Sequence, residues 1–327
     1  MKKNTLRLLG CMMMTWLLVN SSFAQTRPRF SQHLVNHFLI NPAATGAYGY
    51  NEVNLMVRNQ WLGLEDSPRA VGLSGQFTLN LFSRRLLKSL PTIGTTPYTN
   101  TTGKGSSTPD PIPGVGILFY LEENGNYYRR QTYFNIGMPL KLTEKITLSL
   151  GTAFGLIDLR RKEDGVGFLD NLSVTSPHAE GSFLVYSDDF YGGFSAGRMY
   201  EEEASLPEIP NHDQDAVYYH ITGGYRWRLN ENWQVIPTAQ VRIVEGQGAN
   251  VNLSARAAYK EKSWAGIRYQ EGRTIALLAG KVFGQFELNY VYALPLSSLA
   301  LDRLNNHEVT IKYRLGRGLY RFQHNLF

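Results

Sequence analysis

The sequence predicts an all-β protein, a transmembrane outer-membrane β-barrel with about 14 antiparallel strands. Three observations predict this fold class. Apolar and polar residues alternate along most of the chain, as in "HEVTIKYRL" at 307–315, which indicates strands with one apolar side. The alternating stretches reach about 10 residues, the length with which a tilted strand crosses a bilayer. Full charges occupy the polar side, which suits a wet lumen better than a dry core.

Residues 1–24 have the pattern of a secretory signal peptide. Cations precede an apolar run at 8–19, and small residues follow it at Ser22 and Ala24. The run is short of the roughly 20 residues that a membrane helix needs. We therefore expect cleavage near Ala24 and a mature chain from Gln25. A lipoprotein signal at Cys11 is the alternative, but most of the apolar run follows this cysteine instead of preceding it.

Composition narrows the function classes further. The chain has 33 basic and 27 acidic residues, and the signal removes three cations and no acid, which leaves 30 against 27 and a net charge of +3. This near-neutral total gives no basis for nucleic-acid binding. The only cysteine leaves with the signal, so we expect neither disulfides nor thiolate metal sites nor a cysteine nucleophile.

The alternating stretches give fourteen expected strands, an even number as in bacterial barrels of this kind. A sheet inside a membrane has to close on itself because an open edge leaves backbone groups unpaired. Aromatic residues near strand ends suggest interfacial girdles, among them Trp61, Tyr120, Tyr127, Trp233, Tyr259, Trp264 and Tyr292. The expected strands are 51–61, 69–80, 114–121, 129–141, 145–158, 181–187, 190–200, 214–229, 232–244, 250–260, 263–270, 273–281, 285–294 and 307–315.

Strand parity then assigns the connections to the two sides of the membrane. With both chain ends in the periplasm, the short connections "LTEK", "SDD", "LNEN" and "KEKS" fall on the periplasmic side. Longer stretches at 159–180, 201–213 and 295–306 fall outside. The polar insertion at 82–113 breaks this rule because it is both long and periplasmic. It is either a periplasmic extension or contains two further strands.

The barrel, residues 51–315, is preceded by a distinct segment at 25–50 and followed by a tail at 316–327. Asn41-Pro42 favours an extended or turned backbone, and Gly46 permits unusual dihedral angles. We expect 25–50 to be a folded lead-in segment that could act as a plug in the lumen.

The stretches "NPAATG" at 41–46 and "NLMVRNQWLGL" at 54–64, with Pro68 downstream, resemble the opening signature of the PorP/SprF family of type IX secretion system outer-membrane proteins of Bacteroidetes. "FYGGFSAGRMY" at 190–200 and "WAGIRYQEGRTIALLAG" at 264–280 are similar to this family as well. The signature residues, with structural or partner-contact roles, are Asn41, Pro42, Ala43, Gly46, Arg58, Gln60, Trp61 and Pro68.

The resemblance implies a function in protein secretion. The protein would support secretion or surface anchoring of substrates with a C-terminal sorting domain, including gliding adhesins, and would have no cofactor and no enzymatic activity. Its partners would be periplasmic and outer-membrane type IX secretion components, the secreted substrate and outer-membrane lipids. The alternative is an outer-membrane channel for small or hydrophobic solutes, for which a 14-strand barrel has suitable girth.

The polar residues of the first strand also lead to expectations about contacts. Asn54, Arg58 and Gln60 share one strand face and should point into the lumen, where Arg58 could pair with Glu287. Trp61 is on the opposite face and should lie at the lipid boundary. Sealing of the barrel and direct contact with a partner are both compatible with these positions.

Motifs that suggest chemistry fail on their context. Gly193–Gly197 matches a nucleophile elbow, but this pattern needs a strand-to-helix turn, and Ser195 lies in an aromatic-rich strand. His33 and His37 have zinc-ligand spacing without the accompanying glutamate. The loop carboxylates, such as Asp164, Asp170, Asp188 and Asp189, do not follow a calcium-loop spacing.

Basic residues are concentrated in the two long segments that parity assigns to the periplasm. These residues could form one positive patch for an acidic periplasmic partner. A disordered insertion without a partner is the alternative. The patch residues are Arg84, Arg85, Lys88 and Lys104 in the insertion and Arg317 and Arg321 in the tail.

Overall fold

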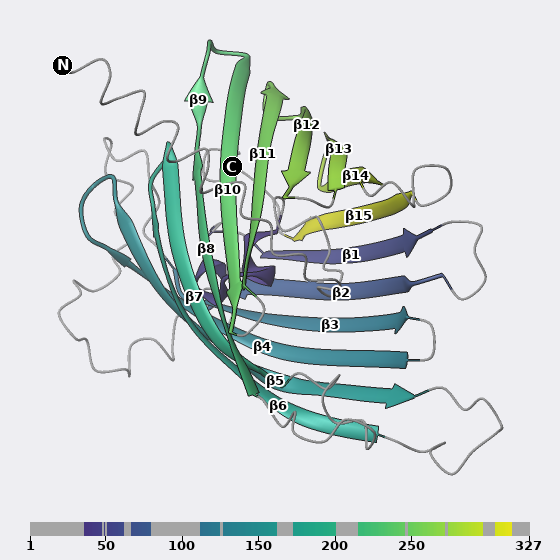
Figure 1. The fold of residues 1–327 in the computed structure, drawn as a ribbon. Coiled ribbons are helices and arrows are strands. Elements are labelled where there is room, and N and C mark those ends of the chain that lie inside the picture. Colours follow the sequence, from purple (N-terminus) through teal and green to yellow (C-terminus); the bar gives the residue numbers. More distant parts are fainter. Residues whose placement is uncertain are drawn as a thin grey trace, which may run out of the picture.

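A computed structural model describes residues 36–47, 49, 51–61, 67–79, 112–124, 127–161, 173–200, 215–245, 248–271, 274–296 and 305–315. Fifteen strands form one antiparallel sheet (Figure 1). Their bounds are β1 Asn51–Gln60, β2 Arg69–Thr78, β3 Gly114–Asn124, β4 Tyr127–Lys141, β5 Thr147–Arg161, β6 Ser173–Tyr186, β7 Phe190–Tyr200, β8 Asp215–Tyr225, β9 Trp227–Arg228, β10 Trp233–Val244, β11 Gly248–Tyr259, β12 Ser263–Gln270, β13 Thr274–Phe283, β14 Phe286–Pro295 and β15 Asn306–Leu315.

The sheet closes into a barrel of 14 strand positions. With β8 and β9 counted as one position, each position pairs with those before and after it in the chain, and β15 pairs with β1 from Asn51 opposite Leu315 to Gln60 opposite Asn306. The two-residue strand β9 continues β8 along the same edge of β10. The register on both sides places Pro237 of β10 opposite the junction, and proline has no N–H with which to continue the ladder.

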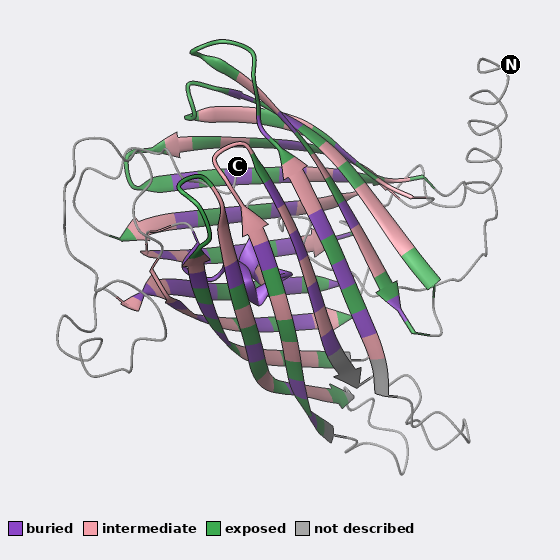
Figure 2. Cartoon of the chain, turned by 90° about the vertical axis from the view of Figure 1, so that its left-hand side faces the viewer, coloured by how far each residue is buried: buried purple, intermediate pink, exposed green. Residues whose placement is uncertain are grey.

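Buried and exposed residues alternate along the strands (Figure 2), and this alternation separates a largely polar inner face from a largely apolar outer face. In β1, Glu52, Asn54 and Arg58 are buried, whereas Leu55 and Val57 between them are 42% and 36% exposed. Such a surface is stable only in contact with lipid, because exposed apolar area on this scale is unfavourable in water. The expected transmembrane barrel is therefore confirmed, with buried charges such as Glu52, Arg58 and Lys312 on its inner face.

Within the described residues, no helix is long and apolar enough to span a membrane. The short 3-10 helices η2 His37–Leu39 and η3 Pro42–Ala44 precede β1 and lie inside the curve of the sheet (Figures 1 and 2). η3 packs against β4, β5 and β6.

The strand at 181–187 was predicted too short. In the structure β5 extends to Arg161 and β6 begins at Ser173, so half of the loop expected at 159–180 belongs to these two strands. The missed residues, "SVTSPHAE", carry no large apolar side chains. Apolar alternation therefore does not mark them as a strand. The expected strand at 214–229 is interrupted at Arg226 for the reason given above.

Two residues of the predicted aromatic girdles lie inside the barrel instead. Tyr120 is buried on the inner face of β3, and Trp264 packs with the buried residues of β13 and β14, with the Arg256 guanidinium 5.1 Å above its ring. By contrast, Trp233 and Tyr259 are exposed and lie with ring centroids 5.0 Å apart. Aromatic content near strand ends thus did not reveal the side to which each ring points.

The two ends of the barrel differ in their connections. At the end where β1 begins and β15 finishes, the connections 142–146, 187–189, 229–232, 260–262 and 284–285 are short. The connections at the other end include 162–172, 201–214 and 296–305. The difference is not complete: the long connection 79–113 lies at the first end, as predicted for the insertion, and the connections 125–126, 245–247 and 271–273 at the second end are short.

Candidate functional site

The interior of the barrel holds the residues that the sequence singled out near the N-terminus. Asn41 caps η3: its Oδ1 accepts a hydrogen bond from the Ala43 N–H at 2.9 Å, while its Nδ2 donates to the Phe183 carbonyl oxygen at 3.0 Å. Pro42 occupies the first position of η3, where no N–H is needed. One asparagine therefore both starts the turn and fixes it to β6.

Further hydrogen bonds join this N-terminal segment, residues 36–47, to the barrel wall. Ser195 Oγ of β7 donates to the Ile40 carbonyl oxygen at 3.0 Å, and Asn135 Nδ2 of β4 donates to the Phe38 carbonyl oxygen at 3.2 Å. The Ala43 N–H also lies 2.9 Å from Ser182 Oγ of β6. The wall thus satisfies backbone groups that a short irregular segment cannot pair by itself.

Small wall residues allow the segment to approach closely. A Cβ atom on Gly151 of β5 would lie 2.1 Å from the backbone nitrogen of Ala43. Gly46 has a φ of +79°, and its N–H donates to Gln76 Oε1 at 3.2 Å. Around this contact the segment and the wall form one apolar cluster of Phe38, Ala43, Ala44, Ala47, Leu184, Tyr191 and Ile236. The "NPAATG" signature is therefore the docking element of the N-terminal segment.

The wall around the β1–β15 seam is charged. Arg58 Nε lies 3.5 Å from Glu308 Oε1, and both side chains are almost fully buried. Arg58 was expected to pair with Glu287, and this was wrong: Glu287 accepts from Arg314 at 2.6 Å instead. Glu308 is directly opposite Arg58 in the ladder, so cross-strand register decides the pairing.

A second buried group continues this charged wall toward β2. Lys312 Nζ lies 3.4 Å from Glu52 Oε2, and Gln76 Nε2 donates to Glu52 Oε1 at 2.8 Å. Gln76 also accepts from Gly46. The amide of Gln76 therefore connects the charged wall with the docked segment.

The remaining signature residues close the far end of β1. The Gln60 N–H donates to the Pro68 carbonyl oxygen and the Trp61 N–H to the Asn305 carbonyl oxygen, both at 2.9 Å. Trp61 has a φ of +54° and a side chain that is 38% exposed. These three residues thus fasten β1 to both neighbouring connections, whereas Asn41 to Gly46 hold the N-terminal segment.

Sequence reasoning missed a histidine–tyrosine cluster on the inner faces of β6 and β8. Tyr218 Oη donates to Glu180 Oε2 at 2.6 Å and lies 3.3 Å from His178 Nε2. The ring of Tyr133 contacts His178, with centroids 4.6 Å apart. Tyr218 reaches Glu180 across Gly197 of the intervening strand β7, which is paired with both residues. The alternating polar and aromatic residues were the available signal, but this register was not readable from sequence.

Residues of the motifs that suggest chemistry make contacts that stabilise the fold. Ser195 is in mid-strand and bonded to Ile40, and His37 is buried in η2 with its ring centroid 4.7 Å from that of Tyr191. Asp189 forms an exposed ion pair with Arg228. Among the residues that the structure describes, no three His, Cys, Asp or Glu side chains gather as a metal site. His33, Asp164 and Asp170 lie outside the described residues.

The predicted basic patch also falls outside the described residues. Arg84, Arg85, Lys88, Lys104, Arg317 and Arg321 belong to 80–111 and 316–327, so the patch stays a prediction.

No curated protein matches this chain. Among solved structures it is similar to the CymD monoaromatic hydrocarbon channel, with 9% identity, a TM-score of 0.48, and coverage of 89% of this chain and 94% of that chain. It is also similar to Omp33 of Acinetobacter baumannii, with 7% identity, a TM-score of 0.45, and coverage of 83% and 100%.

The family comparison covers residues 22–313 and matches the type IX secretion system membrane protein PorP/SprF. This range contains both the N-terminal segment and nearly the whole barrel. The chain belongs to the PorP/SprF family of type IX secretion system membrane proteins, and it is an outer-membrane component of that system.

Proposed function

We propose that this protein supports secretion or surface anchoring of proteins that carry a C-terminal sorting domain, with gliding adhesins among the candidate substrates. Family membership over residues 22–313 is the observation that carries the proposal. A non-catalytic role agrees with the mid-strand position of Ser195, whose hydroxyl is bonded to Ile40. Its partners would be periplasmic and outer-membrane components of the same system.

The N-terminal segment would keep the lumen closed to small solutes. Support comes from its anchoring at β4, β6 and β7 through Asn135, Ser182 and Ser195, together with burial of Phe38, Ala43 and Ala44. A segment fixed at so many points does not leave the barrel without losing all these contacts at once. The channel alternative requires it to move aside.

Gene deletion with complementation separates these two functions. We expect the deletion strain to leave a large secreted or surface protein undelivered, while passive uptake of small apolar solutes is unchanged. The wild-type gene should restore delivery. Normal delivery combined with lost solute uptake would instead support the channel. N-terminal sequencing of the mature protein tests the proposed cleavage near Ala24, with Gln25 as the expected first residue.

The basic residues of the insertion and the tail would help to dock an acidic periplasmic subunit. Exposed charges mainly raise the encounter rate and the salt dependence of association. The test replaces residues 84–104 by a short Gly/Ser turn in one variant and removes 317–327 in another. We expect each to reduce co-purification of periplasmic secretion components. Unchanged co-purification with an assembled barrel contradicts the proposal, and labelling of a Thr101→Cys variant in intact cells would show that the assumed sidedness is wrong.

A further inference from the structure

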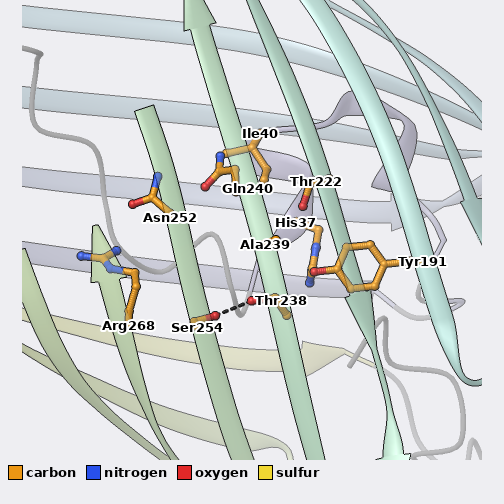
Figure 3. A pocket seen from close by; sticks show the side chains of 10 residues that line it. All are labelled: His37, Ile40, Tyr191, Thr222, Thr238, Ala239, Gln240, Asn252, Ser254 and Arg268. Atoms are coloured by element: carbon orange, nitrogen blue, oxygen red, sulfur yellow. Dashed lines mark hydrogen bonds between the residues drawn. The ribbon is translucent and has the colours of Figure 1, made fainter. Parts of the chain in front are cut away.

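A small cavity lies between the N-terminal segment and the barrel wall (Figure 3). His37 and Ile40 form the side given by the segment, and the inner faces of β7, β8, β10, β11 and β12 form the rest. It offers about 10 Å³ to the centre of a water-sized sphere, enough for roughly one water or one comparably small ion. The wall residues are Tyr191, Thr222, Thr238, Ala239, Gln240, Asn252, Ser254 and Arg268.

The lining carries one permanent cation and no carboxylate. Arg268 is only 4% exposed, and its Nε has no hydrogen-bond partner. Within the described part of the chain, its guanidinium makes no hydrogen bond or ion pair. Glu308 is the acid that attracts it electrostatically, but this carboxylate forms its ion pair with Arg58. Burial of a guanidinium that has no hydrogen bond or ion pair lowers the stability of the protein unless an anion binds beside it.

Neutral hydrogen-bond donors surround the same space. The hydroxyls of Thr238 and Ser254 are hydrogen-bonded to each other, so one of the two hydrogens is left to point elsewhere. Asn252 Nδ2 uses one of its hydrogens on Asn250 Oδ1 at 3.1 Å, and the other remains available. A cation with hydroxyl and amide donors at its side is the environment that an anion requires.

We propose that this cavity binds one small anion, either a halide ion or a carboxylate as small as formate, with Arg268 as the charged ligand. The proposal goes beyond the function in secretion. His37 and Ile40 belong to the N-terminal segment and Arg268 belongs to β12. The anion therefore bridges the segment to a part of the wall other than β4 and β6, where the segment is hydrogen-bonded. Bound anion therefore stabilises the docked position of the segment.

The first experiment measures thermal unfolding of the refolded full-length protein in detergent at constant ionic strength. Sodium gluconate, whose anion is too large for the cavity, is replaced stepwise by sodium chloride, bromide or formate. We expect a saturable rise in Tm with at least one small anion. Equal Tm values in all salts overturn the proposal, whatever any variant does.

Arg268→Gln is the test variant and Arg242→Gln the matched control. Arg242 is also an inward-facing arginine, but its guanidinium lies over the Tyr218 ring at 5.9 Å and does not line the cavity. Loss of a charge-assisted hydrogen bond weakens binding about 10- to 100-fold, and we expect this change for Arg268→Gln alone. Equal weakening in both variants contradicts a local site. Heat-modifiable gel mobility reports whether each barrel has folded.

Crystals of the wild-type protein in sodium bromide give a readout that needs no variant. We expect an anomalous peak within the cavity beside Arg268. Stabilisation by formate without a bromide peak assigns the site to carboxylates, and a peak beside Arg268 assigns it to halides. Bromide peaks elsewhere with no formate effect overturn the site.

Discussion

The two halves of the barrel interior are built on different principles. The wall of β4 to β7 presents glycine and hydroxyl groups and holds the N-terminal segment through Gly151, Ser182 and Ser195. The wall around the β1–β15 seam presents buried ion pairs, such as Arg58 with Glu308 and Lys312 with Glu52. The first wall packs closely against a peptide segment, whereas the charged side chains of the second wall pair mainly with one another. The comparison teaches that alternation alone, which is the same in both halves, does not determine what an inner face does.

The largest effect is expected from breaking the charged wall. Glu308→Gln leaves Arg58 buried without its carboxylate, and removal of one partner from a buried pair costs about 3–5 kcal/mol of stability. Urea or thermal unfolding of the refolded barrel measures the loss. The exposed pair of Asp189 and Arg228 is the control, because Asp189→Asn should cost at most about 1 kcal/mol. Equal costs for the two substitutions would show that the seam wall is as well solvated as the barrel end.

An intermediate effect is expected from crowding the small-residue wall. Gly151→Val places side-chain atoms where the Ala43 backbone lies, and overpacking of this kind costs about 1–3 kcal/mol. Displacement of the segment should be visible as faster proteolysis near residues 36–47 and as raised conductance in planar bilayers.

Gly181→Val is the matched control for this substitution. It lies on the neighbouring strand β6, and a Cβ there meets nothing within 4 Å. If both variants show the same proteolysis and conductance, close approach at Gly151 is not what holds the segment.

The smallest effect is expected from a single anchor of the segment. Asn41→Ala removes the cap of η3 and the hydrogen bond to Phe183, and loss of such a cap costs about 1 kcal/mol. The segment should remain docked but exchange its amide hydrogens faster, which hydrogen-exchange mass spectrometry measures. Asn230→Ala, which removes a similar cap at an exposed turn, should leave exchange in 36–47 unchanged. Slower exchange in Asn41→Ala contradicts the assigned role.

Much of the barrel was predictable because its determinants are local. Strands β1, β7 and β12 have nearly the expected bounds, since a lipid-facing side enforces apolar residues at every second position. The predictions were wrong at positions where contact with lipid does not determine the residue type. Residues 173–180 lack large apolar side chains, and Tyr120 and Trp264 are aromatic residues on the inner face. Side-chain partners depend on register, so Arg58 was assigned to Glu287 instead of Glu308. Only the fold reveals that Asn41 and Gly46 serve the segment while Gln60 and Pro68 serve the β1–β2 connection.

The pairing of β15 with β1 constrains the order in which the molecule can assemble. The seam joins residues about 250 positions apart in the chain, from Asn51–Leu315 to Gln60–Asn306, so it forms only after the last strand is available. The strands that hydrogen-bond the N-terminal segment, β2, β4, β6 and β7, are complete more than 100 residues earlier in the chain. A chain that folds from its N-terminus can therefore dock residues 36–47 onto an open, curved sheet before the circle closes around them. Closure then encloses a segment that is already in place, and no peptide has to thread through a finished pore.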